Sequence, residues 1–323
     1  MPQVTFADAI RAALIEEMKR DERVILLGED IALYGGAFRV TRDLVRHFGP
    51  QRVINTPISE NSFVGVAVGA ALTGMRPVVE MMFMDFIALA MDQIVNHAAK
   101  LHYMYGGQAR VPLVIRAPAG AGRGYGPSHS QSLEAWFVHT PGLKVVAPST
   151  PRDAHGLLKA AIRDDNPVLF VESKLLYGVK GEVPDPDEVV PIGRAAVVRE
   201  GEDVTLLAYS RMTGLAIEAA SRLEGEGLDC EVLDLRTLAP LDEETVVASV
   251  AKTRRAVIVE EDTRRGGVGA ELAAVIAERA FRHLDSPVVR VACADVPIPC
   301  SPALERAVLP SVEKVAAAVK SLI

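Results

Sequence analysis

Short β-branched runs alternate with longer helix-like segments along nearly the whole of this 323-residue chain. The alternation predicts parallel strands joined by helical crossovers, and therefore an α/β fold with helices on both faces of each sheet. In the first half, the expected strands are residues 23–28, 76–81, 111–116, 144–147 and 168–172, and the expected helices include residues 5–19, 86–103 and 152–163.

The alternation is interrupted once, at residues 178–191, where three prolines and several acidic residues are typical of a linker. Apolar runs then resume at residues 204–210 and continue to 287–292. We therefore predict two three-layer α/β domains with mainly parallel sheets, residues 1–185 and 186–323. A length of roughly 150 residues per domain agrees with two domains.

Composition excludes several classes of protein. The 35 Lys and Arg against 42 Asp and Glu give a net charge of −7, and no basic run suggests nucleic-acid binding. The longest uncharged apolar stretch, residues 63–75, is too short for a membrane span. The charged first helix and three widely spaced cysteines lead us to expect a cytoplasmic protein without a disulfide framework. Half of the residues are hydrophobic but only 5% aromatic, which indicates a full core or an apolar surface kept for a partner.

One carboxylate stands where α/β folds place ligand sites. Residues 52–55 are expected to form a strand, Pro57 ends it, and Ser59 can cap a helix that begins near Glu60. Gly65 and Gly69 follow one helical turn apart, which permits close approach of another helix. Glu60 is either a functional group or a first-turn acid favoured by the helix dipole.

A glycine-rich loop, residues 118–132, ends with His129. Its glycines fall at every second position and Pro127 follows them, so the pattern does not match a dinucleotide-binding fingerprint. His129 is either a solvated loop residue or a proton-transfer group delivered into a cleft.

Two further segments each allow two interpretations. Phe83 and Phe86 stand at a strand-to-helix turn and are either core residues or a platform for a planar heterocycle. Residues 160–167 (AAIRDDNP) form either an ordinary Asx turn before a proline or a set of oxygen ligands for a hard cation.

Together, these motifs resemble one family over essentially the full chain: the β subunit of the decarboxylating component of 2-oxo acid dehydrogenase complexes. That family is thiamine-diphosphate dependent and forms α2β2 tetramers with the cofactor bound between α and β. The matching stretches are GED (28–30), YGGAFRVT (34–41), RVINTPISE (52–60), HSQS (129–132), GLKVVAPSTP (142–151), GLLKAAIRDDNP (156–167), DLRTLAPLD (234–242) and GVGAEL (267–272).

The resemblance implies a role for each site residue. Glu60 would face the pyrimidine ring nitrogen and share a proton with it, which favours the imino tautomer that activates the thiazolium carbon. Ile58 and Phe86 would contact the pyrimidine, and His129 would assist transfer to a lipoyl group. A potassium ion is expected at Leu113, Ala161, Ile162, Asp164 and Asn166, mainly through backbone oxygens.

The resemblance also implies partners. Thiamine-diphosphate enzymes hold the diphosphate and Mg²⁺ with a GDG motif, which this sequence lacks, so an α subunit would supply that half of the site. The expected activity is oxidative decarboxylation of a 2-oxo acid with acyl transfer to a lipoyl-bearing acyltransferase core, which the C-terminal domain would contact. The β subunit of acetoin dehydrogenase is an alternative, because residues 73–80, 106–112 and 301–314 also resemble it. A non-catalytic assembly subunit is the second alternative.

Overall fold

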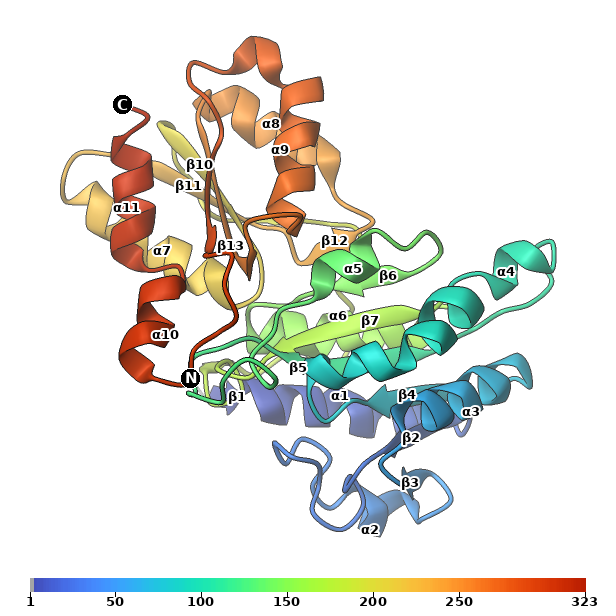
Figure 1. Ribbon diagram of the computed structural model, residues 1–323. Helices are drawn as coiled ribbons and strands as arrows, with labels where there is room; N and C mark the ends of the chain where they lie inside the picture. The colour runs from blue at the N-terminus through green and yellow to red at the C-terminus, as the bar shows by residue number, and fades with distance from the viewer. Residues whose placement is uncertain (1–2) are drawn as a thin grey trace. The chain divides into compact units, whose positions relative to one another are not determined.

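The computed structural model describes residues 3–323 and divides the chain into two compact units (Figure 1). The first contains the chain up to Ala119 together with Trp136–Ile192, and the second contains Gly120–Ala135 together with Gly193–Ile323. The chain passes from the first unit to the second between Ile192 and Gly193, so residue 185, the predicted boundary, lies within the first unit. The loop that carries His129 belongs to the second unit.

The first unit is built on a parallel sheet with the strand order β6-β7-β5-β4-β2-β3. Each strand except β3 is buried along most of its length, as the continuous apolar runs predict for a sheet covered on both faces. The strands are β2 (Val24–Gly28), β3 (Val53–Asn55), β4 (Arg76–Glu80), β5 (Val114–Ala119), β6 (Lys144–Val146) and β7 (Val168–Ser173).

Helices α1 (Phe6–Arg20) and α6 (Pro151–Arg163) pack against each other in this unit. The Thr5 hydroxyl accepts a hydrogen bond from the Asp8 backbone N–H at 3.1 Å, which fixes the start of α1. Apolar residues of both helices fill a core with the sheet, among them Leu14 and Leu157. The remaining helices of the unit are α2 (Leu44–Phe48), α3 (Glu60–Leu72), α4 (Leu101–Met104) and most of α5 (Glu134–Val138).

The long helix expected over residues 86–103 is interrupted. The chain forms a 3-10 helix, η1 (Met84–Ala90), then a π-helix, η2 (Asp92–Ala98), and then α4. The 3-10 helix and the π-helix each differ from the α-helix by less than one residue per turn. Over a few residues, the three helix types therefore show similar spacing of apolar residues. Both η1 and η2 pack against α3.

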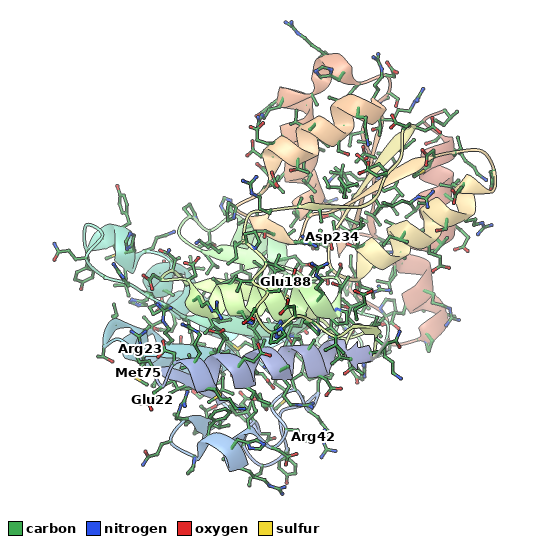
Figure 2. The ribbon with its side chains drawn as sticks, turned by 180° about the vertical axis from the view of Figure 1, so that it is seen from behind. Glu22, Arg23, Arg42, Met75, Glu188 and Asp234 are labelled. Atoms are coloured by element: carbon green, nitrogen blue, oxygen red, sulfur yellow. The ribbon has the colours of Figure 1, made fainter. Side chains whose placement is uncertain are left out.

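The expected linker is more ordered than its composition suggests. Strand β8 (Lys180–Glu182) pairs antiparallel with β1 (Gln3–Thr5). Further on, the Glu188 carboxylate accepts a hydrogen bond from Arg152 of α6 at 2.6 Å (Figure 2). The strand pairing and the Arg152–Glu188 ion pair together hold the segment against the first unit.

The second unit has a five-stranded sheet with the order β14-β13-β10-β11-β9, parallel except for β9. Helices α7 and α11 pack against each other, and α8 packs against α9. Asp234 is the last residue of β11, which lies beside the central strand β10 (Figure 2). The elements are β9 (Ala196–Arg199), β10 (Val204–Ala208), α7 (Arg211–Glu224), β11 (Cys230–Asp234), β12 (Thr237–Ala239), α8 (Glu243–Thr253), β13 (Ala256–Thr263), α9 (Val268–Arg279), η3 (Phe281–His283), β14 (Val289–Cys293), α10 (Pro302–Val308) and α11 (Val312–Lys320).

The predicted fold class is confirmed, since both units combine a mainly parallel sheet with helices. Within residues 3–323, every helix is too short or too polar to cross a bilayer.

Candidate active site

Glu60 is the first residue of α3, as the sequence predicts. Its side chain is buried, with 5% of its surface exposed, although it is a carboxyl group. The Ser59 hydroxyl does not accept from the helix backbone as expected; it donates to Ser62 at 2.8 Å, while the Ser59 carbonyl accepts from the backbone of Phe63. The helix dipole favours a negative charge at the N-terminus of α3, where this buried carboxyl group lies.

A second carboxylate, Glu29, lies in the same region. Glu29 follows β2, is buried, and has one carboxyl oxygen without a hydrogen-bond partner among the described residues. Burial, with the nearby charge of Glu60 and then of Asp30, raises the pKa of Glu29 to about 7. Glu29 is not among the site residues predicted from the sequence. The signal was present in the acidic pair of GED, which directly follows a buried strand.

Phe86 belongs to a row of aromatic rings in the first unit. Its half-buried ring lies edge-on to Phe83, with centroids 6.1 Å apart. Phe83 in turn contacts Phe38, whose ring stacks on Tyr177 at 5.0 Å. The Lys174 ammonium lies 5.0 Å from the Phe83 centroid. Phe86 therefore has neighbouring rings on its Phe83 side that hold it in place, as a stacking platform requires.

Several apolar side chains beside Glu60 are open to solvent. Ile58 is 82% exposed, two residues before Glu60, and Val66 of α3 is also exposed. Gly65 packs closely on η2, since a Cβ there would lie 3.1 Å from the Gln93 side-chain oxygen. Gly69, one turn further, has nothing within 4 Å. The helix is apolar around most of its circumference, which is typical of a helix that is covered on all sides.

His129 lies in the second unit and is half-buried. Its Nδ1 is 3.0 Å from the Ser128 hydroxyl, and its backbone N–H donates to the Gly126 carbonyl at 3.3 Å. The contact with Ser128 engages Nδ1 of the imidazole ring. Ile58, Glu60 and Phe86 belong to the first unit, so the site residues expected from the sequence are divided between the two units.

The residues expected to bind potassium are already engaged in hydrogen bonds. The carbonyls of Ile162 and Asp164 accept from Arg76 at 2.9 and 3.0 Å, and the Asp164 side chain accepts from the backbone of Asn166 and pairs with Lys144. Carbonyls in the last turn of a helix have spare acceptor capacity, which suits a cation held by backbone oxygens. Residues 3–323 contain no group of three or more His, Cys, Asp or Glu side chains placed to hold a metal ion.

A buried ion network crosses the sheet of the first unit. Arg116 of β5 forms two hydrogen bonds with Glu172 of β7, at 2.7 and 2.8 Å, and also pairs with Glu80 of β4. The Tyr177 hydroxyl donates to Glu172 at 2.7 Å. Burial raises the pKa of Glu80, and the positive charge of Arg116 opposes that effect. The network links three adjacent strands, β4, β5 and β7, and the apolar periodicity of the sequence does not reveal it.

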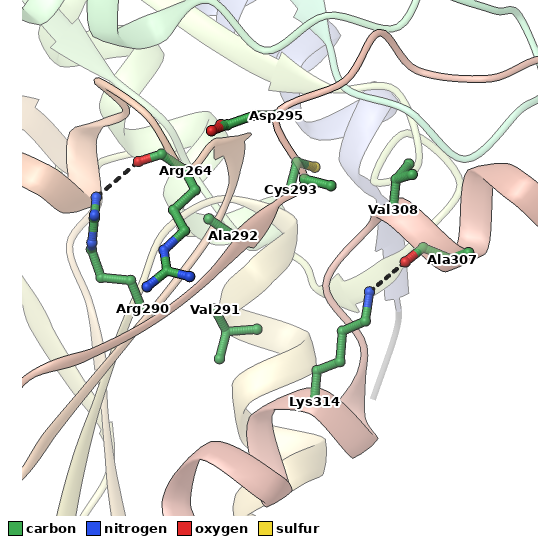
Figure 3. A pocket seen from close by; sticks show the side chains of 10 residues that line it. Arg264, Arg290, Val291, Ala292, Cys293, Asp295, Ala307, Val308 and Lys314 are labelled. Carbon is green, nitrogen blue, oxygen red and sulfur yellow. Dashed lines mark hydrogen bonds between the residues drawn. The ribbon is translucent and has the colours of Figure 1, made fainter.

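The second unit has a hollow of about 470 Å³ with basic side chains on its wall (Figure 3). Arg290 donates to the Arg264 carbonyl at 2.9 Å. Lys314 donates to the carbonyls of Ala307 and Leu309 at 2.7 and 2.6 Å. These hydrogen bonds connect backbone segments around β14 and α10. Arg290 and Lys314 therefore stabilise the fold of this region.

Family models match both parts of the chain. Residues 2–180 match the model described as "Transketolase, pyrimidine binding domain", and residues 193–315 match "Transketolase, C-terminal domain". A solved structure titled "Split gene transketolase, inactive beta4 tetramer" is similar with a TM-score of 0.83 and 29% identity, over 99% of this chain and 98% of that chain.

Curated relatives are similar over the full length. The chain is 49% identical to the pyruvate dehydrogenase E1 component subunit beta of Rickettsia felis, over 99% of this chain and 98% of the relative. It is 50% identical to the protein of that name from Porphyra purpurea, over 100% and 98% of the two chains. The Rhizobium meliloti protein is 49% identical, over 100% of this chain and 70% of the relative. The chain therefore belongs to the family of pyruvate dehydrogenase E1 β subunits, which share the transketolase pyrimidine-binding and C-terminal domains.

Proposed function

We propose that this chain is the β subunit of a heterotetrameric 2-oxo acid dehydrogenase that decarboxylates a 2-oxo acid and transfers the acyl group to a lipoyl group. The buried carboxyl of Glu60 carries the proposal, because it starts α3 and has a second buried carboxyl group, Glu29, for a neighbour. The identity of about 49–50% to E1 β subunits supports the same conclusion.

The residues around Glu60 fit the pyrimidine half of thiamine diphosphate. A carboxyl with little solvent contact, an aromatic ring and an exposed isoleucine offer a proton donor, a flat surface and an apolar contact. Thiamine diphosphate, when bound, supplies the carbon nucleophile and electron sink for decarboxylation, which no side chain provides.

Glu60 would exchange a proton between its carboxyl oxygen and a ring nitrogen. Glu29 assists, since a neighbour with a pKa of about 7 can hold part of the local proton population near neutral pH. Phe86 and Ile58 would orient the ring and keep water from it. His129, whose Nδ1 contacts the Ser128 hydroxyl, would assist acyl transfer to the lipoyl group.

An α subunit would complete the site. This chain has no GDG motif, so we assign the diphosphate and Mg²⁺ to α in an α2β2 tetramer. The exposed Ile58, Val66 and Leu72, together with the open face at Gly69, are apolar surface that such a partner would cover. The C-terminal domain would contact the lipoyl-bearing acyltransferase core, and we place the complex in the cytoplasm. A potassium ion at Leu113, Ala161, Ile162, Asp164 and Asn166 belongs to the same proposal.

Glu60→Gln and Glu60→Ala in the reassembled tetramer test the catalytic role. We expect decarboxylation to fall by at least about a hundredfold, because general acid–base groups contribute 10² to 10⁴ in rate. Glu22→Gln is the matched control, an exposed acid of the same unit that points away from the fold (Figure 2). Full activity of Glu60→Ala in an intact tetramer would contradict the assignment.

Binding and substrate assays separate the alternatives. Calorimetry should detect tight, Mg²⁺-dependent binding of thiamine diphosphate only when both subunits are present; a non-catalytic assembly subunit would add no binding. Pyruvate, branched-chain 2-oxo acids and acetoin should then be compared as substrates of the same tetramer. The named relatives lead us to expect pyruvate.

A further inference from the structure

Two buried carboxylates of the second unit hold the glycine-rich loop by its backbone. Glu261, near the end of β13, accepts from the Ala121 N–H at 2.6 Å. Glu305 of α10 accepts from the N–H groups of Gly122 at 2.8 Å and Gly124 at 3.1 Å. Both carboxylates have less than a tenth of their surface exposed. Hydrogen bonds from backbone N–H groups to an ionised acceptor are among the stronger ones in proteins.

The positions of the glycines follow from these contacts. Gly120, Gly122, Gly124 and Gly126 all have φ between +68° and +99°, which side chains disfavour. A Cβ at Gly120 would lie 2.8 Å from the Glu261 carboxylate. Backbone that alternates in this way turns its N–H groups toward an anion, and here a carboxylate of the same chain occupies that position.

Two backbone hydrogen bonds link the anchored part of the loop to the segment around His129. The Gly120 N–H donates to the Gln131 carbonyl at 3.1 Å and closes the base of the loop. The His129 N–H donates to the Gly126 carbonyl at 3.3 Å. Gly126 lies between the amides that Glu305 holds and His129. It packs against Cys300, since a Cβ at Gly126 would lie 2.5 Å from the sulfur. The place of the imidazole therefore depends on the part of the loop that Glu305 and Glu261 hold.

We propose that Glu305 is a positioning residue for the proposed acyl-transfer reaction, with Glu261 as its second anchor. Glu305 acts through the backbone of residues 122–126 and sets the location of His129 without touching substrate. The inference rests on the proposed role of His129, but the anchoring itself can be measured without catalysis.

The test uses α2β2 tetramers with Glu305→Ala or Glu305→Gln in the β subunit. Amide hydrogen exchange of a peptide that spans residues 120–132 reports the anchoring. We expect the Gly122 and Gly124 amides to exchange at least tenfold faster in Glu305→Ala, and much of the protection to return in Glu305→Gln, which keeps one acceptor oxygen. Glu278→Gln, an exposed acid of α9, is the control and should leave exchange unchanged.

Separate kinetics of decarboxylation and of reductive acylation test whether Glu305 positions His129. In Glu305→Ala we expect kcat for reductive acylation of a lipoyl domain to fall about tenfold, with the KM for the 2-oxo acid unchanged. Decarboxylation measured with an artificial electron acceptor should change by less than twofold, and Glu305→Gln should recover most of the transfer. Size-exclusion chromatography and circular dichroism confirm that each tetramer is assembled and folded.

Three results would overturn the inference: unchanged exchange in Glu305→Ala, an equal loss in both half-reactions, or a Gln variant no better than Ala. Failure of the proposed function would look different. The wild-type tetramer would then be inactive on every 2-oxo acid, and exchange alone would decide whether Glu305 anchors the loop.

Discussion

Stability should depend on pH through Glu260, a carboxyl group in the core of the second unit. Glu260 is fully buried on β13. One oxygen accepts from the Gly269 N–H at 2.6 Å, and the other has no partner among the described residues. Burial raises its pKa from 4.5 to about 7; the Gly269 bond opposes this, nearby Asp262 adds to it, and Arg290 lowers it.

The direction of the pH dependence follows from the protonation of Glu260 in the unfolded and folded states. The unfolded chain releases this proton near pH 4.5, whereas the folded chain keeps it until about pH 7. The folded state binds more protons between these values, so the contribution of Glu260 to stability is lost as the pH rises through that window. The separation of the two pKa values corresponds to about 3 kcal/mol in the free energy of unfolding.

Glu260→Gln tests this by keeping the shape and removing the charge. We expect similar free energies of unfolding at pH 4.5, and a variant more stable than wild type by about 3 kcal/mol at pH 8. Urea unfolding of the full chain at fixed protein concentration measures the free energy of unfolding at each pH. Glu278→Gln, an exposed acid, should show no such trend. A difference between wild type and Glu260→Gln that stays constant from pH 4.5 to 8 would refute the reasoning.

Three further predictions concern other parts of the molecule. Replacing Arg116 with Met should lower the free energy of unfolding, measured by urea denaturation, by about 3–5 kcal/mol, because two buried carboxylates lose their shared cation. A loss below about 1 kcal/mol would show that the two carboxyl groups are neutral. If potassium binds near Asp164, KCl should raise the Tm by about 2–4 °C over NaCl at equal ionic strength, and equal Tm values would contradict the site. One thiol per native chain, that of the exposed Cys300, should react rapidly with a disulfide reagent. Cys230 and Cys293 are buried, and burial raises the pKa of both thiols. Rapid reaction of two or three thiols would contradict this packing.

Local features of the fold are predictable because the signal and the structure lie close together in the sequence. The start of α1 at Thr5 and of α3 at Glu60 depends on a few neighbouring residues. The buried strands follow from continuous apolar runs, which only a sheet covered on both faces explains. The break of residues 84–104 into three helix types was not predictable, since nearly the same apolar period fits all three.

The arrangement of the site is less predictable because it depends on contacts between distant segments. Glu29 and Glu60 come together through two parallel strands, and sequence spacing does not measure that distance. The loop that carries His129 is held by Glu261 and Glu305, 140 and 183 residues away from the amides they accept. Motif resemblance predicted a role for His129 but carried no information about which residues hold its loop.

The division of the chain into units affects how it can be cut and how it is synthesised. Residues 120–135 leave the first unit and join the second, and the chain then returns to complete the first. A fragment that starts at Gly193 would lack the backbone donors that satisfy Glu261 and Glu305, and would expose the cluster of Cys293 and Leu309 that Ala121 covers. On the ribosome, the loop emerges well before either of its anchors. The loop can therefore reach its final geometry only after nearly the whole chain has been synthesised, and residues 193–323 alone do not contain the whole of the second unit.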